Sequence, residues 1–462
     1  MEQKRTFDCI KAYDVRGVVP DALDATVATR IAWALVEMLD PKNCVIGWDV
    51  RSHSPMLVDA LSKALTQQGV DVMQLGLAGT EEVYYWAGEH QLDLGLMVTA
   101  SHNPAEYNGI KIVRRGASPM IGEFSMEAVR ETAERLTQPP KQNVVPGRIT
   151  QQQDKDPFVQ KLLSFVDVTQ LKPLKIIINS GNGVAGRVIE KLSAILPFEI
   201  VHIQPEPDGT FPNGIPNPLL PEKRGASIDA VKRHRADLGV AFDGDFDRCF
   251  FFDEDGRFIE GYYIVGLLAE ALLAQHPEGT VCYDPRLIWN TEDVVTRLGG
   301  GLKMTQSGHT FLKAGMRKSG AIYGGEMSAH HYFKDFYYCD SGMLPWLLVA
   351  QLISTQGKGL KALVDDMIKR FPCTGEINFA LSDRQAQSET IERIAQHYQA
   401  SASHVDHLDG LSLQFAGEGW RFNVRSSNTE PLLRLNIETR ANPQLAKAKL
   451  AEMTDLIVSD AS

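Results

Sequence analysis

The sequence predicts an α/β protein made of several successive domains, and three observations support this prediction. Strand-like and helix-like segments alternate through the first two-thirds of the chain, as βαβ units around a largely parallel sheet require. Beyond Phe371-Pro372 the strand-like runs lie closer together, which is typical of a smaller α+β domain. The chain has 462 residues, and this length alone accommodates about three domains of roughly 150 residues each.

The composition restricts the class of protein. Hydrophobic residues make up 44% and charged residues 23%, which is ordinary globular usage and excludes disordered, collagen-like and small disulfide-framework proteins. The net charge of -11 argues against a broad nucleic-acid-binding surface. The six cysteines are scattered without a CxxC pair, which indicates reduced thiols.

Two apolar runs, 264–274 and 343–353, are each short for a membrane span, and the N-terminal residues lack the apolar core of a signal peptide. We expect both runs to form buried helices. The protein should be cytoplasmic, should bind neither membrane nor nucleic acid, and should be a monomer or a homodimer.

The order of elements favours four domains, because each of four units carries its own polar loop. The first, residues 1–150, has strand-like Cys44–Gly47, a helical stretch over Met56–Gln68, and the strands Val70–Leu75 and Leu94–Ala100. For the second, residues 151–256, the expected elements are the strands Leu174–Asn179, Phe198–Ile203 and Asp237–Phe242, a proline-rich loop Pro205–Pro221, and a hairpin turn at Asp255-Gly256.

The third domain, residues 257–369, is expected to hold two apolar helices and the strands Thr280–Tyr283 and Ala321–Tyr323. For the fourth, residues 370–462, the expected elements are the strand Thr374–Leu381, the helix Arg384–Tyr398, a hairpin of Leu411–Phe415 and Trp420–Val424, the strand Leu432–Glu438 and a closing helix. Ligands of parallel α/β sheets gather at the carboxyl ends of strands, so the polar loops there are the candidate sites.

The first polar loop, Thr99–Pro104, directly follows a buried strand. Its Ser101 would stand at a sheet edge, where His102 or Lys111 could exchange a proton with the hydroxyl, as nucleophilic catalysis requires. Ser101 lacks the flanking glycines of GxSxG, which argues against a hydrolase nucleophile elbow. A serine N-cap or turn ahead of Asn-Pro explains the same residues equally well.

The second loop, Asp243-Gly244-Asp245-Phe246-Asp247-Arg248, places three carboxylates at alternate positions, which an extended segment would project to one side. Such oxygen ligands suit Mg²⁺, and Arg248 is suited to binding a phosphate. We reject an EF-hand, because Arg248 stands where that loop needs glycine. A solvated turn is disfavoured, because clustered carboxylates repel one another unless a cation joins them.

The third loop, Gly324–His331, contains Glu326 and Ser328 at alternate positions, and both suit sugar hydroxyls. His330 could act as an acid or base near neutral pH. Taken alone, this motif is better explained as a polar turn with core histidines.

The fourth loop, Arg425–Pro431, combines hydroxyls, an amide, backbone N–H groups and arginine, and Arg434 follows. Together these groups would make a phosphate cradle, although a capped turn accounts for them as well.

A further motif, Gly181–Gly186, fits the dinucleotide-binding pattern GxGxxG, with Glu206 lying 20 residues beyond Gly186. A single match in mid-chain is weak evidence, and a tight strand-to-helix turn needs glycines for steric reasons alone. We therefore favour a structural turn over a dehydrogenase, which would have to bind NAD.

The order of the four loops is more specific than any one of them: Ser-His-Asn-Pro, alternating Asp, Glu-Met-Ser, then Arg-Ser-Ser-Asn-Thr. In this order the whole chain resembles the α-D-phosphohexomutase superfamily, and most closely its bacterial phosphomannomutase branch. The closer likeness lies in Phe242–Asp247, Gly261–Tyr263 and Gly325–Phe333. The resemblance implies three similar α/β domains with mixed sheets, and a C-terminal α+β domain, around a central cleft.

The resemblance also implies a role for each candidate residue. Ser101 would be a phosphoserine that completes a Mg²⁺ site with Asp243, Asp245 and Asp247. The implied roles of the others are proton handling for Arg16, Lys111 and His330; orientation of Ser101 for His102; binding of the reacting phosphoryl group for Arg248; binding of sugar hydroxyls for Glu326 and Ser328; and binding of the non-reacting phosphate for Arg425, Ser427, Asn428, Thr429 and Arg434.

The reaction implied is the interconversion of mannose 6-phosphate and mannose 1-phosphate, which supplies GDP-mannose synthesis. Phospho-Ser101 would transfer its phosphoryl group, with a hexose 1,6-bisphosphate as intermediate and activator. A phosphoglucomutase or a mutase of dual specificity is the alternative. A Mg²⁺-dependent phosphatase is disfavoured, because it has no need of a cradle for a second phosphate.

Overall fold

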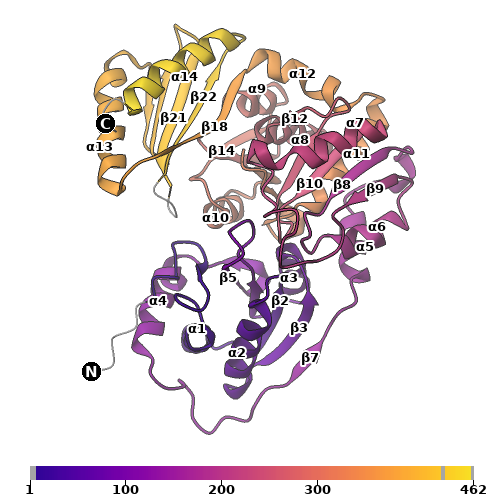
Figure 1. The fold of residues 1–462 in the computed structure, drawn as a ribbon, viewed down its shortest axis with the longest axis vertical. Coiled ribbons are helices and arrows are strands. Elements are labelled where there is room, and N and C mark those ends of the chain that lie inside the picture. The colour runs from indigo at the N-terminus through magenta and orange to yellow at the C-terminus, as the bar shows by residue number, and fades with distance from the viewer. Residues whose placement is uncertain (1–6, 428–431, 459–462) are drawn as a thin grey trace. The chain divides into compact units, whose positions relative to one another are not determined.

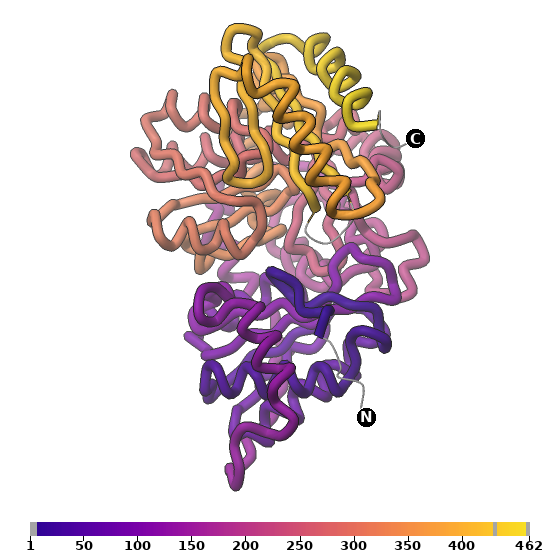
Figure 2. The backbone as a smooth tube through the Cα atoms, turned by 90° about the vertical axis from the view of Figure 1, so that its left-hand side faces the viewer, coloured from indigo at the N-terminus to yellow at the C-terminus, as the bar shows by residue number. Residues whose placement is uncertain are grey.

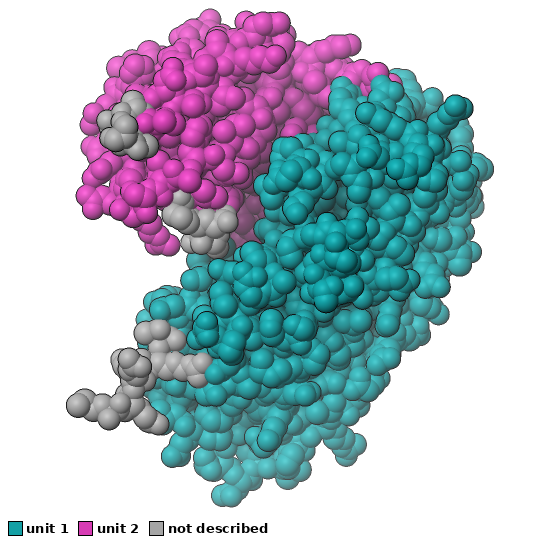
Figure 3. Space-filling model, viewed as in Figure 1, with its two compact units in different colours: residues 1–258, 330–359 teal, residues 259–329, 360–462 magenta. Residues whose placement is uncertain are grey.

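The computed structural model describes residues 7–427 and 432–458. The chain divides into two compact units, which Figure 3 colours separately. Unit 1 comprises residues 1–258 and 330–359, and unit 2 comprises residues 259–329 and 360–462.

The first sheet of unit 1 is mixed (Figure 1). Its strands, in spatial order, are β1 (Val15–Val18), β5 (Tyr107–Arg114), β4 (Leu94–Val98), β2 (Asn43–Trp48), β3 (Asp71–Leu77) and β7 (Ile149–Gln151), and β6 (Ser118–Pro119) pairs with β5. The run β4-β2-β3-β7 is parallel, whereas β1-β5-β4 is antiparallel. The helices are α1 (Ala25–Leu39), α2 (Ser54–Gln67), α3 (Thr80–Glu89) and α4 (Met126–Arg135).

Successive residues of β2 point to opposite faces of the sheet, and their contacts show which helices cover each face. Cys44 and Ile46 join one apolar core with residues of α1, α2 and α4. Gly47 points to the other face, where a Cβ would lie 2.9 Å from Val83 of α3. The first turn of α3 is thereby brought to the carboxyl ends of β2 and β4.

The second sheet of unit 1 has β9 (Glu199–Ile203), β8 (Lys175–Asn179) and β10 (Leu238–Phe242) in parallel, followed by β11 (Cys249–Phe252) in antiparallel orientation. Its helices are α5 (Asp156–Leu163), α6 (Gly186–Ser193) and α7 (Gly225–His234). The predicted turn at Asp255-Gly256 is confirmed, because the Gly256 N–H donates to the Asp253 carbonyl at 2.8 Å. Unit 1 also contains the antiparallel pair β16 (His331–Phe333) and β17 (Cys339–Asp340), and α11 (Met343–Gln356).

Unit 2 begins with α8 (Gly261–Gln275) and three parallel strands in the order β14 (Gly301–Met304), β13 (Thr280–Tyr283) and β15 (Tyr323–Gly325). The helices α9 (Trp289–Arg297), α10 (His309–Ser319) and α12 (Leu360–Arg370) belong to it as well. β12 (Phe258–Ile259) spans the division between the two units.

The C-terminal part of unit 2 is an antiparallel sheet covered by two helices. Its strands are β18 (Cys373–Ala380), β22 (Leu432–Thr439), β21 (Trp420–Ser426), β20 (Leu411–Phe415) and β19 (His404–Asp406) in spatial order. Ile394 of α13 (Arg384–Tyr398) and Met453 of α14 (Pro443–Val458) belong to the same apolar core as the strands. Both helices therefore lie on one face of this sheet, as Figure 2 shows.

The predicted α/β class with mixed sheets and a C-terminal α+β part is confirmed by these elements. The two apolar runs are the buried helices α8 and α11, as expected. Among residues 7–427 and 432–458, no helix has both the length and the apolar character needed to cross a bilayer. The four domain boundaries stay predictions, since the two compact units cut the chain differently and assign residues 330–359 to unit 1.

Candidate active site

Ser101 lies just beyond the end of β4, in a loop of residues 99–107 that we name the serine loop. Its side chain is buried, and its Oγ donates to Oδ2 of Asp243 at 2.7 Å. The backbone of Ser101 is left-handed, with a φ of +50°, which is uncommon for a residue other than glycine. Such a conformation persists only where the surroundings impose it, and it is often found where function requires it.

The three predicted metal-binding carboxylates converge, but on a turn rather than on the extended segment that the sequence led us to expect. One ligand oxygen from each of Asp243, Asp245 and Asp247 lies within 4.8 Å of the others. The Phe246 N–H donates to the Asp243 carbonyl at 3.2 Å, and Phe246 has a φ of +45°. The buried Phe246 ring occupies the place that a side chain at residue 79 would need, since a Cβ on Gly79 would lie 2.1 Å from it. We name residues 243–248 the aspartate loop.

Glycines let the serine loop, the aspartate loop and the 181–186 turn approach one another. A Cβ on Gly244 would lie 2.7 Å from the Ser101 carbonyl oxygen, and a Cβ on Gly183 would lie 2.6 Å from the Gly244 carbonyl oxygen. Both distances are too short for a side chain, so backbone meets backbone here. This close packing supports our interpretation of Gly181–Gly186 as a steric requirement of the turn.

Two cations contact the three carboxylates of the aspartate loop and offset part of their negative charge. Lys111 on β5 donates through Nζ to Oδ2 of Asp245 at 2.6 Å, and it also contacts Oδ2 of Asp247. Arg248 donates through Nε to Oδ2 of Asp243 at 2.9 Å. All five side chains are at least nine-tenths buried.

Three carboxylates face two cations in the aspartate loop, and the pKa shifts of Asp243 and Lys111 agree with an excess of negative charge there. Burial raises the pKa of Asp243, against the charge of Arg248, and the neighbouring Asp247 and Asp245 raise it further. Burial would lower the pKa of Lys111, but the charges of Asp245 and Asp247 outweigh it and raise that pKa. The ammonium group therefore stays charged here, which suits charge stabilisation better than proton acceptance.

His102 lies between Ser101 and Arg248. Its Nδ1 is 3.0 Å from the Ser101 Oγ and also contacts the guanidinium of Arg248. Burial, and next the positive charge of Arg248, hold the pKa of His102 well below its ordinary value. The imidazole is therefore neutral near neutral pH and can accept a hydrogen bond from either neighbour.

Arg16 on β1 contacts the serine loop from the other side. Its Nη1 donates to Oδ1 of Asn103 at 2.6 Å, and its Nη2 donates to Asp14 at 2.6 Å. The pairing of β1 with β5 positions it, because Arg16 lies opposite Gly109.

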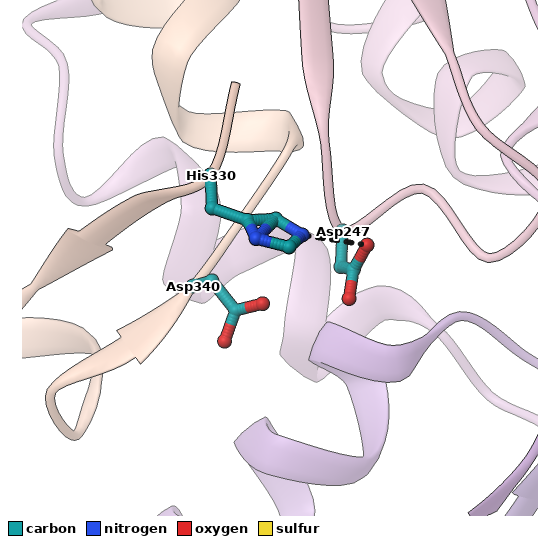
Figure 4. A group of neighbouring side chains, drawn as sticks. All are labelled: Asp247, His330 and Asp340. Atoms are coloured by element: carbon teal, nitrogen blue, oxygen red, sulfur yellow. Dashed lines mark ion pairs between the residues drawn. The ribbon is translucent and has the colours of Figure 1, made fainter. Parts of the chain in front are cut away.

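His330 stands beside the aspartate loop and lies between two buried carboxylates, those of Asp247 and Asp340 (Figure 4). Its Nε2 is 3.5 Å from Oδ1 of Asp247. One ligand atom from each of the three residues lies within 4.8 Å of the others. The arrangement fixes the imidazole next to the aspartate loop, where it can give or take a proton.

The donor set of the aspartate loop fits a divalent cation. Oδ1 of Asp245 and Oδ1 of Asp247 are buried and have no hydrogen-bond partner within the described part of the chain. Oxygen atoms buried in this way require a positive charge or a donor. The ligand atoms are all carboxylate oxygens, the type that Mg²⁺ prefers. Asp243, Asp245 and Asp247 are thus the residues that could hold such an ion.

Two residues of this site escaped the sequence interpretation. Thr80, at the start of α3, donates through Oγ1 to Oδ2 of Asp245, and its backbone N–H donates to the Asp245 carbonyl at 3.1 Å. Asp340, at the end of β17, is fully buried beside His330. Neither belongs to a motif: Thr80 looks like an ordinary helix start, and Asp340 follows Cys339 in an unremarkable strand.

In unit 2, Glu326 and Ser328 follow β15 and share one arginine. Nη2 of Arg286 lies 3.3 Å from Oε1 of Glu326 and 3.2 Å from the Ser328 Oγ. Arg286 itself is held by Asp284, to which its Nε and Nη2 donate at 2.9 Å each. Asp284 and Arg286 follow β13, which pairs in parallel with β15, so both loops leave the same sheet edge.

Arg425 and Arg434 are cross-strand neighbours on β21 and β22, and both lie near the carboxylate of Glu376 on β18. Oε2 of Glu376 is 3.6 Å from Arg425 and 3.5 Å from Arg286, and Oε1 is 3.5 Å from Arg434. Burial raises the pKa of Glu376, but the three arginines outweigh this and lower it. We name Arg286, Arg425, Arg434 and Glu376 the arginine cluster.

The end of the fourth loop is only partly described. Ser427 is buried, and its N–H donates to the Leu432 carbonyl at 2.8 Å. Asn428 and Thr429 lie outside the described residues. Of the predicted site residues, the structure thus brings together in unit 1 Arg16, Ser101, His102, Lys111, Asp243, Asp245, Asp247, Arg248 and His330, and places in unit 2 Glu326, Ser328, Arg425, Ser427 and Arg434. Arg286 and Glu376 were missed, because neither lies in one of the four loops.

Comparison with known families accounts for most of the chain. Models of the phosphoglucomutase/phosphomannomutase family match in four successive parts. These are the alpha/beta/alpha domains I (residues 8–139), II (residues 156–256) and III (residues 260–371), and the C-terminal domain (residues 376–456).

Individual relatives are similar to this chain over nearly its full length. The chain is 51% identical over 456 residues to a phosphomannomutase of Salmonella montevideo, covering 98% of this chain and 99% of the relative. It is 50% identical over 456 residues to a protein of Xanthomonas campestris pv. campestris named phosphohexose mutases, with the same coverage. A crystal structure of a phosphoglucomutase/phosphomannomutase family protein from Burkholderia thailandensis is 29% identical and superposes with a TM-score of 0.85, over 99% of this chain and 98% of that one.

Proposed function

The chain belongs to the phosphoglucomutase/phosphomannomutase family, and we propose that within this family it interconverts mannose 6-phosphate and mannose 1-phosphate. It is a mutase, an isomerase of the α-D-phosphohexomutase superfamily, with the four-domain α/β architecture of that family. The names of its full-length relatives, phosphomannomutase in Salmonella montevideo and in Escherichia coli, favour mannose as the sugar. The product would supply GDP-mannose synthesis.

One observation supports the mechanism more than any other: the Ser101 Oγ lies 2.7 Å from Asp243, next to a converging carboxylate triad. We propose that Ser101 carries the transferable phosphoryl group and that Asp243, Asp245 and Asp247 hold Mg²⁺ with it. When bound, Mg²⁺ supplies positive charge to the phosphoryl oxygens. A hexose 1,6-bisphosphate serves as intermediate and as activator.

The cations of unit 1 have separate tasks in this proposal. Arg248 binds the reacting phosphoryl group, for which its planar guanidinium is suited. Lys111, which the carboxylates keep charged, stabilises negative charge on that group and on its acceptor. His102 orients the Ser101 hydroxyl from a distance of 3.0 Å.

His330 and Arg16 handle the proton of the sugar hydroxyl. His330 is only partly buried, with a side chain that is 17% exposed, so a substrate can reach it. Arg16 supports the serine loop through Asn103 and lends positive charge. Transfer of the proton to His330 frees the hydroxyl oxygen to attack phosphorus, and the reverse step returns it.

The residues of unit 2 bind the rest of the substrate. Glu326 and Ser328 accept hydrogen bonds from sugar hydroxyls, and the shared Arg286 holds both side chains in place. Arg425, Ser427, Asn428, Thr429 and Arg434 hold the phosphate that does not react. Because these residues bind whichever phosphate is distal, the site accepts either isomer of the substrate.

A mutase of dual specificity is the second candidate, because the Xanthomonas campestris pv. campestris relative is named for phosphohexose in general. A coupled assay with mannose 1-phosphate and glucose 1-phosphate, in Mg²⁺ and a trace of hexose 1,6-bisphosphate, separates the two. We expect faster turnover of mannose 1-phosphate. Equal turnover of both would favour dual specificity, and no turnover of either would contradict the proposed function.

A further inference from the structure

Arg51, which follows β2, is a fully buried arginine that binds the serine loop through its backbone. Its Nη1 donates to the carbonyls of Pro104 at 2.6 Å and Tyr107 at 2.8 Å. Its Nη2 donates to the carbonyls of Ser101 at 2.9 Å and Asn103 at 2.6 Å. One side chain thus holds four carbonyl oxygens of the loop that carries the reactive serine. Arg51 is only 1% exposed.

A buried carboxylate, Asp49, anchors this arginine and extends the support to Ser101. Oδ2 of Asp49 lies 3.3 Å from Nε of Arg51 and accepts from the Thr99 hydroxyl at 2.8 Å. The Thr99 hydroxyl in turn accepts from the Ser101 N–H at 2.8 Å. The carbonyl and the N–H of Ser101 are therefore both connected to the same Asp49–Arg51 pair.

The proline-rich loop of residues 205–221 closes over Arg51. The Arg51 guanidinium lies 5.4 Å from the centre of the Phe211 ring, which is itself 5% exposed. The loop also touches the chain next to Arg51, since a Cβ on Gly209 would lie 2.1 Å from the Val50 carbonyl oxygen. Water is thereby kept from the arginine, and exclusion of water strengthens its hydrogen bonds.

These contacts explain how Ser101 keeps its left-handed backbone. The serine loop has carbonyls that point inward and a serine with a φ of +50°. Such a conformation is unfavourable by itself and must be held in place by several contacts. The planar fork of arginine presents several N–H donors in fixed directions, whereas lysine has one nitrogen on a flexible stem. A lysine at position 51 could pair with Asp49 but could not bind four carbonyls at once.

We propose that Arg51 is a positioning residue for phosphoryl transfer, which acts by holding the serine loop so that the Ser101 Oγ faces Asp243. Phe211 of the proline-rich loop assists it by covering the guanidinium. The inference rests on the proposed role of Ser101. It assigns a task to Arg51 and to the proline-rich loop, which none of the four loop motifs contains.

The test compares Arg51→Lys and Arg51→Gln with the wild type in the full-length protein. Misplacement of a reacting group by about 1 Å costs on the order of 100-fold in rate, so we expect a loss of kcat of that size in both variants. The KM for the hexose phosphate should change by less than about threefold, because the substrate contacts of unit 2 are intact. Hydrogen exchange of the amides at residues 99–107 should accelerate in both variants.

Two further variants separate positioning from simple stability. Arg30→Gln removes another arginine, half-buried, that donates to a backbone carbonyl (Glu134, at 2.8 Å) and lies 4.7 Å from an aromatic ring (Phe7), and it should lower the melting temperature without changing kcat. Phe211→Leu leaves Arg51 in place and should lower kcat less than Arg51→Gln does, again with little change in KM. If Arg51→Gln does not fold, Arg51→Lys and Phe211→Leu carry the test.

The inference is wrong if Arg51→Lys keeps wild-type kcat, or if exchange at residues 99–107 is unchanged. It is also wrong if kcat falls only in proportion to the fraction unfolded, as Arg30→Gln would show. The rate of hydrogen exchange measures how firmly the serine loop is held, and this measurement does not depend on which substrate the enzyme uses. An inactive wild type whose serine loop is loosened in the Arg51 variants would therefore count against the proposed function and not against the loop support.

Discussion

The aspartate loop of unit 1 and the arginine cluster of unit 2 are both buried groups of mixed charge. Residues of the same type nevertheless have their pKa values shifted in opposite directions in the two regions. Burial acts to lower the pKa of Arg248, but the carboxylates of Asp243, Asp247 and Asp245 together outweigh it and the pKa is raised. Burial lowers the pKa of Arg425, and the charge of Arg286 lowers it further. The carboxyls behave likewise: the pKa of Asp243 is raised, whereas that of Glu376 is lowered.

The difference supports our proposal that the two regions bind ions of opposite charge. In the aspartate loop the excess charge is negative, so the site is completed by a cation. The arginine cluster gathers three guanidinium groups, although Asp284, Glu326 and Asp409 also contact them, and guanidinium groups are suited to binding an anion such as a phosphate. Burial is common to both regions, and the surrounding charges decide whether a pKa is raised or lowered.

Ser101→Ala should produce the largest loss. Removal of the nucleophile of a phosphoryl-transfer enzyme eliminates its intermediate, so we expect mutase turnover to fall by at least about 10⁴-fold. Steady-state assays with hexose 1-phosphate and bisphosphate measure this. Ser328→Ala, at a serine of unit 2, should mainly raise KM. Full activity in Ser101→Ala would remove Ser101 from its proposed role.

Asp245→Asn should weaken metal binding. The change removes one of the buried carboxylates whose Oδ1 has no hydrogen-bond partner among the described residues. We expect the dissociation constant for Mg²⁺ alone, measured by calorimetry, to rise by roughly 10–100-fold. Asp167→Asn, at an exposed position, is the control. An unchanged affinity would place the metal elsewhere.

Arg425→Lys should weaken substrate binding with little effect on the chemical step. Loss of a charge-assisted hydrogen bond costs about 1.5–3 kcal/mol, so KM should rise by roughly 10–100-fold. The control is Arg440→Lys, an exposed arginine of unit 2. A loss of kcat with an unchanged KM would contradict the anion-binding role of the cluster.

His331→Gln tests how burial affects a pKa and the stability of the protein, because no carboxylate is among the causes of the His331 shift. Burial, and next the charge of His330, lower the pKa of His331 to about 3 from an ordinary 6.5. Between these values the unfolded state binds more protons than the folded state, so stability falls as the pH falls, by up to about 1.4 kcal/mol per pH unit. Urea unfolding between about pH 7 and about pH 5 should show a smaller loss in His331→Gln than in the wild type.

The matched control variant for this measurement is His404→Gln, at an exposed histidine of unit 2. An identical pH dependence in His331→Gln and the wild type would mean that other groups cause the acid sensitivity.

Much of the fold could be predicted from the sequence, because the hydrophobic patterns of its segments match the burial of those segments in the structure. The helix Arg384–Tyr398 and the strand Leu411–Phe415 coincide with α13 and β20, and both apolar runs proved to be buried helices. The aspartate loop was read correctly as a convergence of carboxylates but wrongly as extended. The left-handed conformation of Phe246 depends on packing against Gly79, which is distant in the sequence.

The residues that support the site could not be found in this way. Arg51 and Glu376 each act through partners far away in the sequence, as Arg51 does with residues 101–107 and Glu376 with Arg425. A single arginine after a strand looks like a surface residue, and only the fold shows that four carbonyls surround it. Motifs locate reacting groups, because chemistry restricts their types, whereas supporting groups are set by topology.

Isotopic labelling determines directly whether Ser101 carries the phosphoryl group. The wild-type enzyme is incubated with Mg²⁺ and hexose 1,6-bisphosphate that bears a labelled phosphate, and the label is located by peptide mapping. We predict that the label is found on the peptide that contains Ser101, that added hexose phosphate removes it, and that Ser101→Ala acquires none. Label on any other residue, or no label during active turnover, would contradict the account.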